Sequence, residues 1–304
     1  MKISVVTTLY KSERFVVEFY ERITKVVREL TDDYELIFVN DGSPDISSQK
    51  VLNIRKSDTN VKLIELSRNF GHHKAVMTGL KYASGDYMYL LDIDLEEPPE
   101  LLTEFYASLI ENNVDVVYGV QEKRKGKFFE KITGKFFYRM FNLLSEISIE
   151  ENILMARLMN KDYVDSLKEY TEKELFLGGV FAMVGYKQIS VPVAKGSRPD
   201  TTYTFKKKMS LLVNAITATS NRLLIYVFYL GLIVSVTSFV YLGYFVIRAI
   251  FYKDYLEGWP SLIVSIWFLS GLIIMSIGVL GIYLSKIFNE VKQRPLTTIS
   301  KIYD

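Results

Sequence analysis

Two long stretches without a charged residue constrain this chain most. Residues 223–247 and 260–284 are each 25 residues long and contain no Asp, Glu, Lys or Arg. A helix needs about 20 apolar residues to cross the hydrocarbon core of a bilayer, so both stretches are long enough to span a membrane. The alternative is a pair of buried core helices, but such helices are seldom apolar on every side over this length.

Basic residues on either side of this pair predict its orientation. Residues 206–208 are three lysines, Arg222 precedes the first stretch, and four more basic residues follow the second, whereas residues 248–259 contain only two. Since basic residues stay on the cytoplasmic side, we expect a juxtamembrane basic segment (206–222), a short external loop (248–259) and a cytosolic tail (285–304). Residues 1–205 would form a cytosolic domain without a signal peptide.

Composition excludes several kinds of chemistry. The chain of 304 residues has a net charge of +2, which argues against nucleic acid as the main partner. It has no cysteine and two histidines, which rules out disulfides, thiolate metal sites and a cysteine nucleophile. Any metal ion would have to be held by oxygen ligands, as Mg²⁺ commonly is.

Strand and helix patterns alternate over the first 120 residues. Short β-rich runs fall at residues 3–9, 35–39, 61–66, 87–91 and 114–120, and helical spacing falls between them at 14–30, 47–55, 73–83 and 100–112. This alternation predicts an α/β fold with a mainly parallel sheet and helices on both faces. Neither G-x-G-x-x-G nor a P-loop occurs, which argues against dinucleotide oxidoreductases and P-loop NTPases.

Polar side chains follow four of the expected strands, where the ligands of such sheets bind. They are Thr8 and Tyr10, Asp41, Arg68, and finally Asp92 with Asp94. In an extended chain, residues two apart share a face, so Asp92 and Asp94 would point together, and Glu96 would continue that face. This pattern suits Mg²⁺ or Mn²⁺ held together with diphosphate oxygens, with a solvated strand end as the alternative.

Several segments carry a resemblance to a known family. They are residues 4–10 (SVVTTLY), 38–43 (FVNDGS), 67–71 (SRNFG), 83–86 (ASGD), 91–100 (LDIDLEEPPE) and 177–186 (LGGVFAMVGY). With the two apolar stretches, the chain resembles family-2 inverting glycosyltransferases of GT-A fold. It is most similar to the membrane-anchored group that contains dolichyl-phosphate mannose synthase and undecaprenyl-phosphate glucosyltransferase.

The resemblance implies roles for single residues. Thr8 and Asp41 would contact the nucleotide base and Arg68 the donor; the alternatives are an Asx turn at Asp41, which could coexist with that contact, and a surface ion pair at Arg68. Asp92 would bind the ribose or the metal, and Asp94 the metal and the diphosphate. Further candidates are Tyr10 at the donor site, Glu96 beside the metal, and Arg198 and Tyr203 in a segment that matches one closing over the site.

The sequence departs from the family at the expected catalytic carboxylate. Met155 stands where the family often has an aspartate, while Arg157 remains as a contact for a diphosphate or an acceptor phosphate. Glu150 or Glu151 could replace the missing acid, or form a solvated acidic loop. An acceptor phosphate needs no base, because its second pKa of about 6 leaves it largely dianionic at neutral pH.

Residues 128–147 have the pattern of a helix lying in the membrane interface. Aromatic and aliphatic residues recur at helical spacing, opposite Lys131, Lys135 and Arg139. Such a basic amphipathic helix is typical of interfacial segments, although a helix facing a protein core has the same periodicity.

These observations predict an enzyme of the cytoplasmic membrane with two spans. It would transfer a hexose with inversion from a UDP-sugar to a polyprenyl phosphate such as undecaprenyl phosphate, using Mg²⁺ or Mn²⁺, for glycan assembly. Alternatives are transfer to the hydroxyl of a lipid-linked sugar or diacylglycerol, and a degenerate transferase that acts as a membrane scaffold. The resemblance also implies homo-oligomers that associate through the spans.

Overall fold

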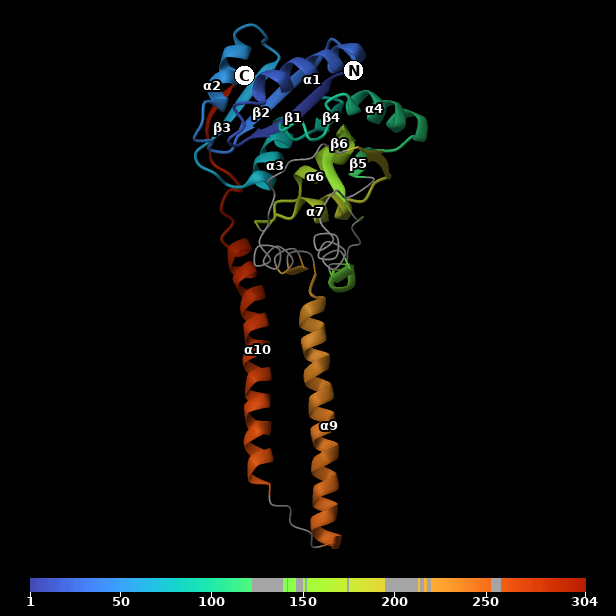
Figure 1. Ribbon diagram of the computed structural model, residues 1–304, viewed down its shortest axis with the longest axis vertical. Helices are drawn as coiled ribbons and strands as arrows, with labels where there is room; N and C mark the ends of the chain where they lie inside the picture. Colours follow the sequence, from blue (N-terminus) through green and yellow to red (C-terminus); the bar gives the residue numbers. More distant parts are fainter. Residues whose placement is uncertain are drawn as a thin grey trace.

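The structure is a computed structural model with one mixed sheet and two long helices that project from it (Figure 1). It describes residues 1–121, 139–140, 142–145, 150, 152–173, 175–194, 213, 216–217, 220–252 and 258–304. The expected interfacial helix at 128–147 falls largely outside the described residues. Arg198, Tyr203 and the lysines at 206–208 lie outside them entirely.

The sheet has eight strands in the order β7-β5-β6-β4-β1-β2-β3-β8. The strands are β1 (Ile3–Leu9), β2 (Tyr34–Asn40), β3 (Val61–Leu66), β4 (Tyr87–Leu90), β5 (Val116–Gln121), β6 (Ile153–Asn160), β7 (Gln188–Val193) and β8 (Ile299–Tyr303). Strands β4, β1, β2 and β3 are mutually parallel, and β6 and β8 are antiparallel to their neighbours. The predicted α/β fold with a mainly parallel sheet is confirmed.

Helices cover both faces of this sheet. They are α1 (Val16–Leu30), α2 (Ser47–Arg55), α3 (His72–Tyr82), α4 (Leu101–Asn112), α6 (Lys161–Lys168) and α7 (Leu177–Met183). Alternate residues of the strands feed two separate cores: Val5 packs with α1, α2 and α4, whereas its neighbour Val6 packs with α3, α6 and α7. The strands are therefore apolar on both faces, as expected of parallel strands buried between helical layers.

Two long apolar helices, α9 (Arg222–Tyr252) and α10 (Trp259–Val291), extend away from the sheet (Figure 1). The hydroxyl of Tyr283 in α10 donates to the carbonyl of Ser220 just before α9, at 2.7 Å. Among the described residues, one helical stretch, Ser265–Val291, is long and apolar enough to span a membrane, and no residue of its most apolar part is buried. The apolar stretch in α9, Arg222–Ser238, is shorter, so two spans remain a prediction.

The end of the chain departs from the expectation of a tail at 285–304. Helix α10 continues to Val291, and residues 299–303 return to the sheet as β8, antiparallel to β3. The amide of Ser67 donates to the carbonyl of Thr298 at 2.9 Å, and the hydroxyls of Thr78 and Thr297 lie 2.8 Å apart. The predicted domain boundary at residue 205 therefore leaves out one strand of the sheet.

Candidate active site

The ends of β1 and β4 are joined by a histidine. Thr8 is the penultimate residue of β1, and its Oγ1 lies 3.0 Å from Nδ1 of His72. Nε2 of the same ring lies 3.4 Å from Oδ1 of Asp92, just beyond β4. Burial lowers the pKa of His72 below its ordinary value, against the opposing pull of Asp41 and Asp94. In the neutral tautomer with its proton on Nε2, Nδ1 accepts the Thr8 proton while Nε2–H faces Asp92.

The end of β2 fixes the loop that leads into this histidine. Asp41 is 3% exposed, and its two carboxylate oxygens accept the amides of Phe70 at 2.7 Å and Gly71 at 3.0 Å. Burial raises the pKa of Asp41 more than these two bonds lower it. This loop is closed not by Asp41 but by Asn40, whose Oδ1 accepts the amide of Ser43, three residues on, at 2.8 Å.

Gly42 allows the β2 and β3 loops to touch. Its φ is +62°, and a Cβ atom there would lie 2.5 Å from backbone atoms of both Arg68 and Asn69. Only glycine fits so close an approach in this backbone region. The guanidinium of Arg68 bonds the carbonyl of Asn69 and lies 4.1 Å from the ring centre of Phe70. Arg68 has no ion pair among the described residues, so that alternative finds no support there.

The carboxylates after β4 lie in a loop whose burial alternates over residues 92–94. Asp92 and Asp94 are partly exposed and flank Ile93, which is 5% exposed and belongs to the core. Leu95 then turns the chain with φ +58°, and the amide of Glu96 donates to Oδ1 of Asp94 at 3.1 Å. Glu96 therefore does not continue the extended face, contrary to the expectation from the spacing.

The donor set suits a metal ion only in part. Among the described residues, no three His, Asp or Glu side chains are gathered closely enough to hold an ion. Two neighbouring carboxylates nonetheless offer the hard oxygen ligands that Mg²⁺ and Mn²⁺ take. They fit an ion whose remaining ligands come from a bound diphosphate or from water.

Arg157 lies on the strand next to β4 and is almost fully buried. It pairs with Leu90 in the antiparallel β4–β6 ladder and is 3% exposed. Met155, the residue that departs from the family pattern, lies two residues before Arg157 in the same strand, β6. Burial lowers the pKa of Arg157 to about 10, which leaves it charged at neutral pH.

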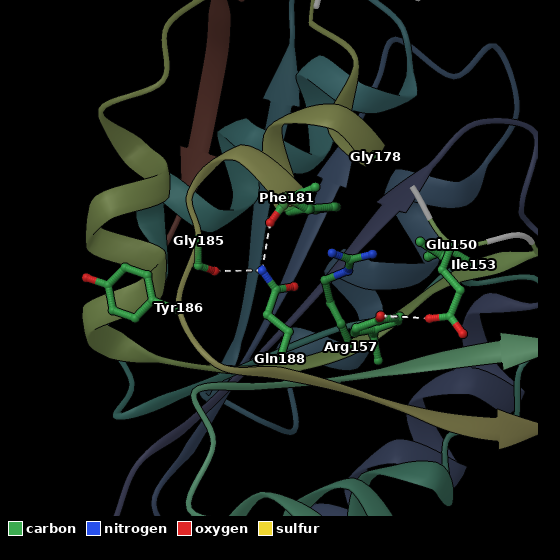
Figure 2. Close-up of a pocket in the computed structure, with 10 residues that line it drawn as sticks. Glu150, Ile153, Arg157, Gly178, Phe181, Gly185, Tyr186 and Gln188 are labelled. Atoms are coloured by element: carbon green, nitrogen blue, oxygen red, sulfur yellow. Dashed lines mark hydrogen bonds between the residues drawn. The ribbon is translucent and has the colours of Figure 1, made fainter. Parts of the chain in front are cut away.

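The guanidinium of Arg157 faces a cavity of about 250 Å³ beside α7 (Figure 2). Its Cζ lies 3.5 Å from the ring centre of Phe181, and Nε is buried without a hydrogen-bond partner. The opposite wall carries Glu150, which accepts the hydroxyl proton of Tyr118 at 2.8 Å. Burial and this bond raise the pKa of Tyr118 to about 12. Glu151 lies outside the described residues.

Sequence reasoning missed two residues that the structure places at this site. His72 is the first residue of α3, and its ring contacts both Thr8 and Asp92. Glu97 is 2% exposed and accepts the amide of Ala156 at 2.7 Å, which ties the carboxylate loop to β6. A second glutamate directly after Glu96 was the available signal. Tyr10, by contrast, is 48% exposed beyond the end of β1.

Comparison with known proteins agrees with this arrangement. The model of the family described as "Glycosyl transferase family 2" matches residues 4–168. The chain belongs to glycosyl transferase family 2. As a member of this family it is a transferase enzyme, and the predicted family is confirmed.

Two relatives align with almost the whole chain. A Mycobacterium tuberculosis protein named as a glycosyltransferase is 46% identical over 303 residues, covering 100% of this chain and 89% of the relative. An Escherichia coli protein named "Prophage bactoprenol glucosyl transferase homolog" is 33% identical, covering 99% of each chain. The crystal structure of Staphylococcus aureus TarS 1–349 is 19% identical with a TM-score of 0.47, covering 72% of this chain and 65% of that one.

Proposed function

We propose that this family-2 enzyme transfers a sugar from a nucleotide-sugar donor to a polyprenyl phosphate at the cytoplasmic face of a membrane. The observation that carries the proposal is the pairing of β4 and β6. It sets a buried guanidinium, Arg157, on the strand next to the one that ends at Asp92 and Asp94. Relatives named as bactoprenol glucosyl transferases and the exposed apolar helix α10 support a lipid acceptor and a membrane location.

The donor would lie along the ends of β1, β2 and β4. The loop held by Asp41 and the Thr8–His72 contact shape this edge. Asp92 and Asp94 would hold Mg²⁺ or Mn²⁺, which when bound stabilises the charge on the departing nucleoside diphosphate. The donor is proposed to be a UDP-hexose, in line with the glucosyl transferase relatives.

The acceptor phosphate would lie at the cavity of Arg157. A fixed guanidinium neutralises and orients a phosphate without a covalent role. A phosphate oxygen would attack the anomeric carbon from the face opposite the leaving group. The new carbon–oxygen bond forms as the bond to the diphosphate breaks, which inverts the anomeric centre. No proton has to leave a dianionic phosphate, so Met155 in place of an aspartate is compatible with this reaction.

A hydroxyl acceptor is the second candidate, and one observation favours it. Glu150 lies on the wall of the same cavity and is hydrogen-bonded to Tyr118, where a carboxylate could serve as a base. The scaffold alternative predicts no transfer at all. An assay with different acceptors therefore distinguishes transfer to a phosphate, transfer to a hydroxyl and no transfer.

The test incubates the purified full-length protein with radiolabelled UDP-sugars, Mg²⁺ or Mn²⁺, and undecaprenyl phosphate, diacylglycerol or a lipid-linked sugar. We expect a glycolipid labile to mild acid, formed only with the phosphate acceptor. Asp94→Asn should reduce the rate at least about 100-fold if the carboxylate holds the metal. Asp32→Asn, at an exposed position, is the matched control. Product only with a hydroxyl acceptor, or full activity of Asp94→Asn, would contradict the proposal.

A further inference from the structure

A second cavity, of about 330 Å³, lies between α3, the segment after α6 and the segment that follows α10. It shares no lining residue with the cavity of Arg157. Among the described residues, no aspartate or glutamate lines it, although Glu290 accepts the amide of Lys173 at its edge at 2.6 Å, and four of its lining residues are basic: Lys81, Lys168, Lys173 and Arg294. A cavity with basic walls and no acidic wall favours an anionic occupant.

Two of these four basic residues are stabilised by their position at the C-terminal end of a helix, and the other two are not. Lys81 and Lys168 lie in the last turns of α3 and α6, where a positive charge interacts favourably with the helix dipole. Lys168 also pairs with Asp165 at 2.8 Å. Lys173 and Arg294 lie outside any helix, and within the described part of the chain neither has a carboxylate at ion-pair distance. An anion bound between these two residues and the helix ends would lower the mutual repulsion of the four positive charges.

The cavity adjoins the end of the helix that could span a membrane. The stretch Ser265–Val291 is 27 residues long, which at about 1.5 Å a residue exceeds the roughly 30 Å of a hydrocarbon core. Arg294 follows three residues after Val291, so a membrane spanned by this stretch would bring its side chain close to the lipid headgroups. Gln293 turns the chain with φ +46°, and the following segment runs along α3 toward β8 (Figure 1). The contact between Thr297 and Thr78, at 2.8 Å, holds this wall in place.

We propose that this cavity binds the phosphate of an anionic membrane lipid headgroup. Its cations supply the charge-assisted hydrogen bonds that a phosphate diester accepts, and the hydroxyl of Thr171 adds a neutral donor. The bound lipid holds α3 and the segment after α10 together, and so fixes the sheet against the bilayer. The inference rests on the membrane location given in the proposed function, but not on the transfer reaction.

The test measures thermal unfolding of the detergent-solubilised full-length protein titrated with phosphatidylglycerol, phosphatidylcholine or inorganic phosphate. Phosphatidylglycerol should raise the melting temperature more than the zwitterionic lipid does. The double variant Lys173→Gln/Arg294→Gln should bind it about 30-fold more weakly, from about fivefold for each charge removed. The control Lys25→Gln/Lys56→Gln removes the same charge from exposed positions outside the cavity and should behave as wild type.

The possible results distinguish a lipid site, a site for free phosphate and no anion site in this cavity. Weaker phosphatidylglycerol binding in the cavity variant alone supports the site and its lipid source. Stabilisation by inorganic phosphate but not by phosphatidylglycerol, lost in the same variant, supports a phosphate site and overturns the lipid source. Equal lipid stabilisation of wild type and cavity variant overturns the proposal. Thermal unfolding reports lipid binding whether or not the protein catalyses transfer, so failure of the proposed reaction would not affect this test.

Discussion

Replacing Asp41 by asparagine tests whether this carboxylate organises the donor edge. Each oxygen of Asp41 accepts one backbone amide, from Phe70 and from Gly71, in a buried position. Asparagine keeps one acceptor and turns an NH₂ group toward the other amide, so one buried N–H loses its partner. A lost charge-assisted bond and an unpaired buried donor together cost about 2–4 kcal/mol.

This cost should be visible in thermal unfolding. For a domain of this size, each kcal/mol shifts the melting temperature by about 2–4 °C, so Asp41→Asn should melt about 5–15 °C lower. Gly71 is the N-cap of α3 and precedes His72, so nucleotide binding, measured by calorimetry with UDP, should weaken as well. Asp32→Asn makes the same chemical change at an exposed position and should change neither quantity.

The two readouts separate two roles for Asp41. Loss of both stability and binding means that Asp41 holds the loop, as its bonds indicate. Loss of UDP binding with the melting temperature within about 1 °C of the control would mean direct contact with the nucleotide, and would refute the reasoning from the two amide bonds.

Two further substitutions test other parts of the structure. Burial raises the pKa of Glu35, but bonds from Ser4 and Ser84 and the charge of Lys2 outweigh it, and the net pKa is lowered from 4.5. Its stabilisation is therefore present above the ordinary carboxyl pKa and lost as pH falls through the lowered one. In denaturant at pH 7, Glu35→Gln should lower the free energy of unfolding by about 1–3 kcal/mol relative to wild type. This difference should become smaller below about pH 4.5, and a difference that does not change with pH would contradict the reasoning. In steady-state kinetics, Arg157→Lys should raise KM for the lipid phosphate about tenfold and change KM for the donor little, because an ammonium group cannot reproduce the planar fork of a guanidinium. An unchanged KM for the acceptor would mean that Arg157 does not bind it.

Local patterns predicted the first nine elements of the fold closely. Strands 3–9 and 61–66 and the helix at 47–55 agree with the structure residue for residue, and the others differ by one or two residues at an end. These segments are apolar on both faces or have clear helical spacing, so their neighbours along the chain decide their conformation. The sheet after residue 121 was not anticipated, because its strands pair over long sequence separations.

Strand β8 shows why such pairing is hard to foresee. Its five residues, ISKIY, are half polar and follow a long apolar helix, a context in which a solvated tail is the simpler expectation. Its partner β3 lies more than 230 residues earlier. The strand forms because β3 offers an unpaired edge, and nothing in the five residues themselves specifies that edge.

The sequence predicted which residues lie at the candidate site better than it predicted the contacts between them. Thr8 and Asp92 were both expected near the donor, and the structure brings each into contact with His72. Asp92 and Asp94 flank the buried Ile93, but Glu96 does not continue their face, because Leu95 adopts a left-handed conformation that the sequence does not predict. The partner of Asp41 was equally hidden, since its two amides lie 29 and 30 residues away.

The placement of β8 has a consequence for the order in which the molecule is made. The last strand of the sheet is contributed by residues 299–303, after both long apolar helices. During synthesis, the ribosome must therefore complete α9 and α10 before the edge of β3 can be covered. Until then that edge is open to pairing with another chain. Removing the final six residues, or fusing a bulky tag directly to them, would leave every new molecule in this half-finished state.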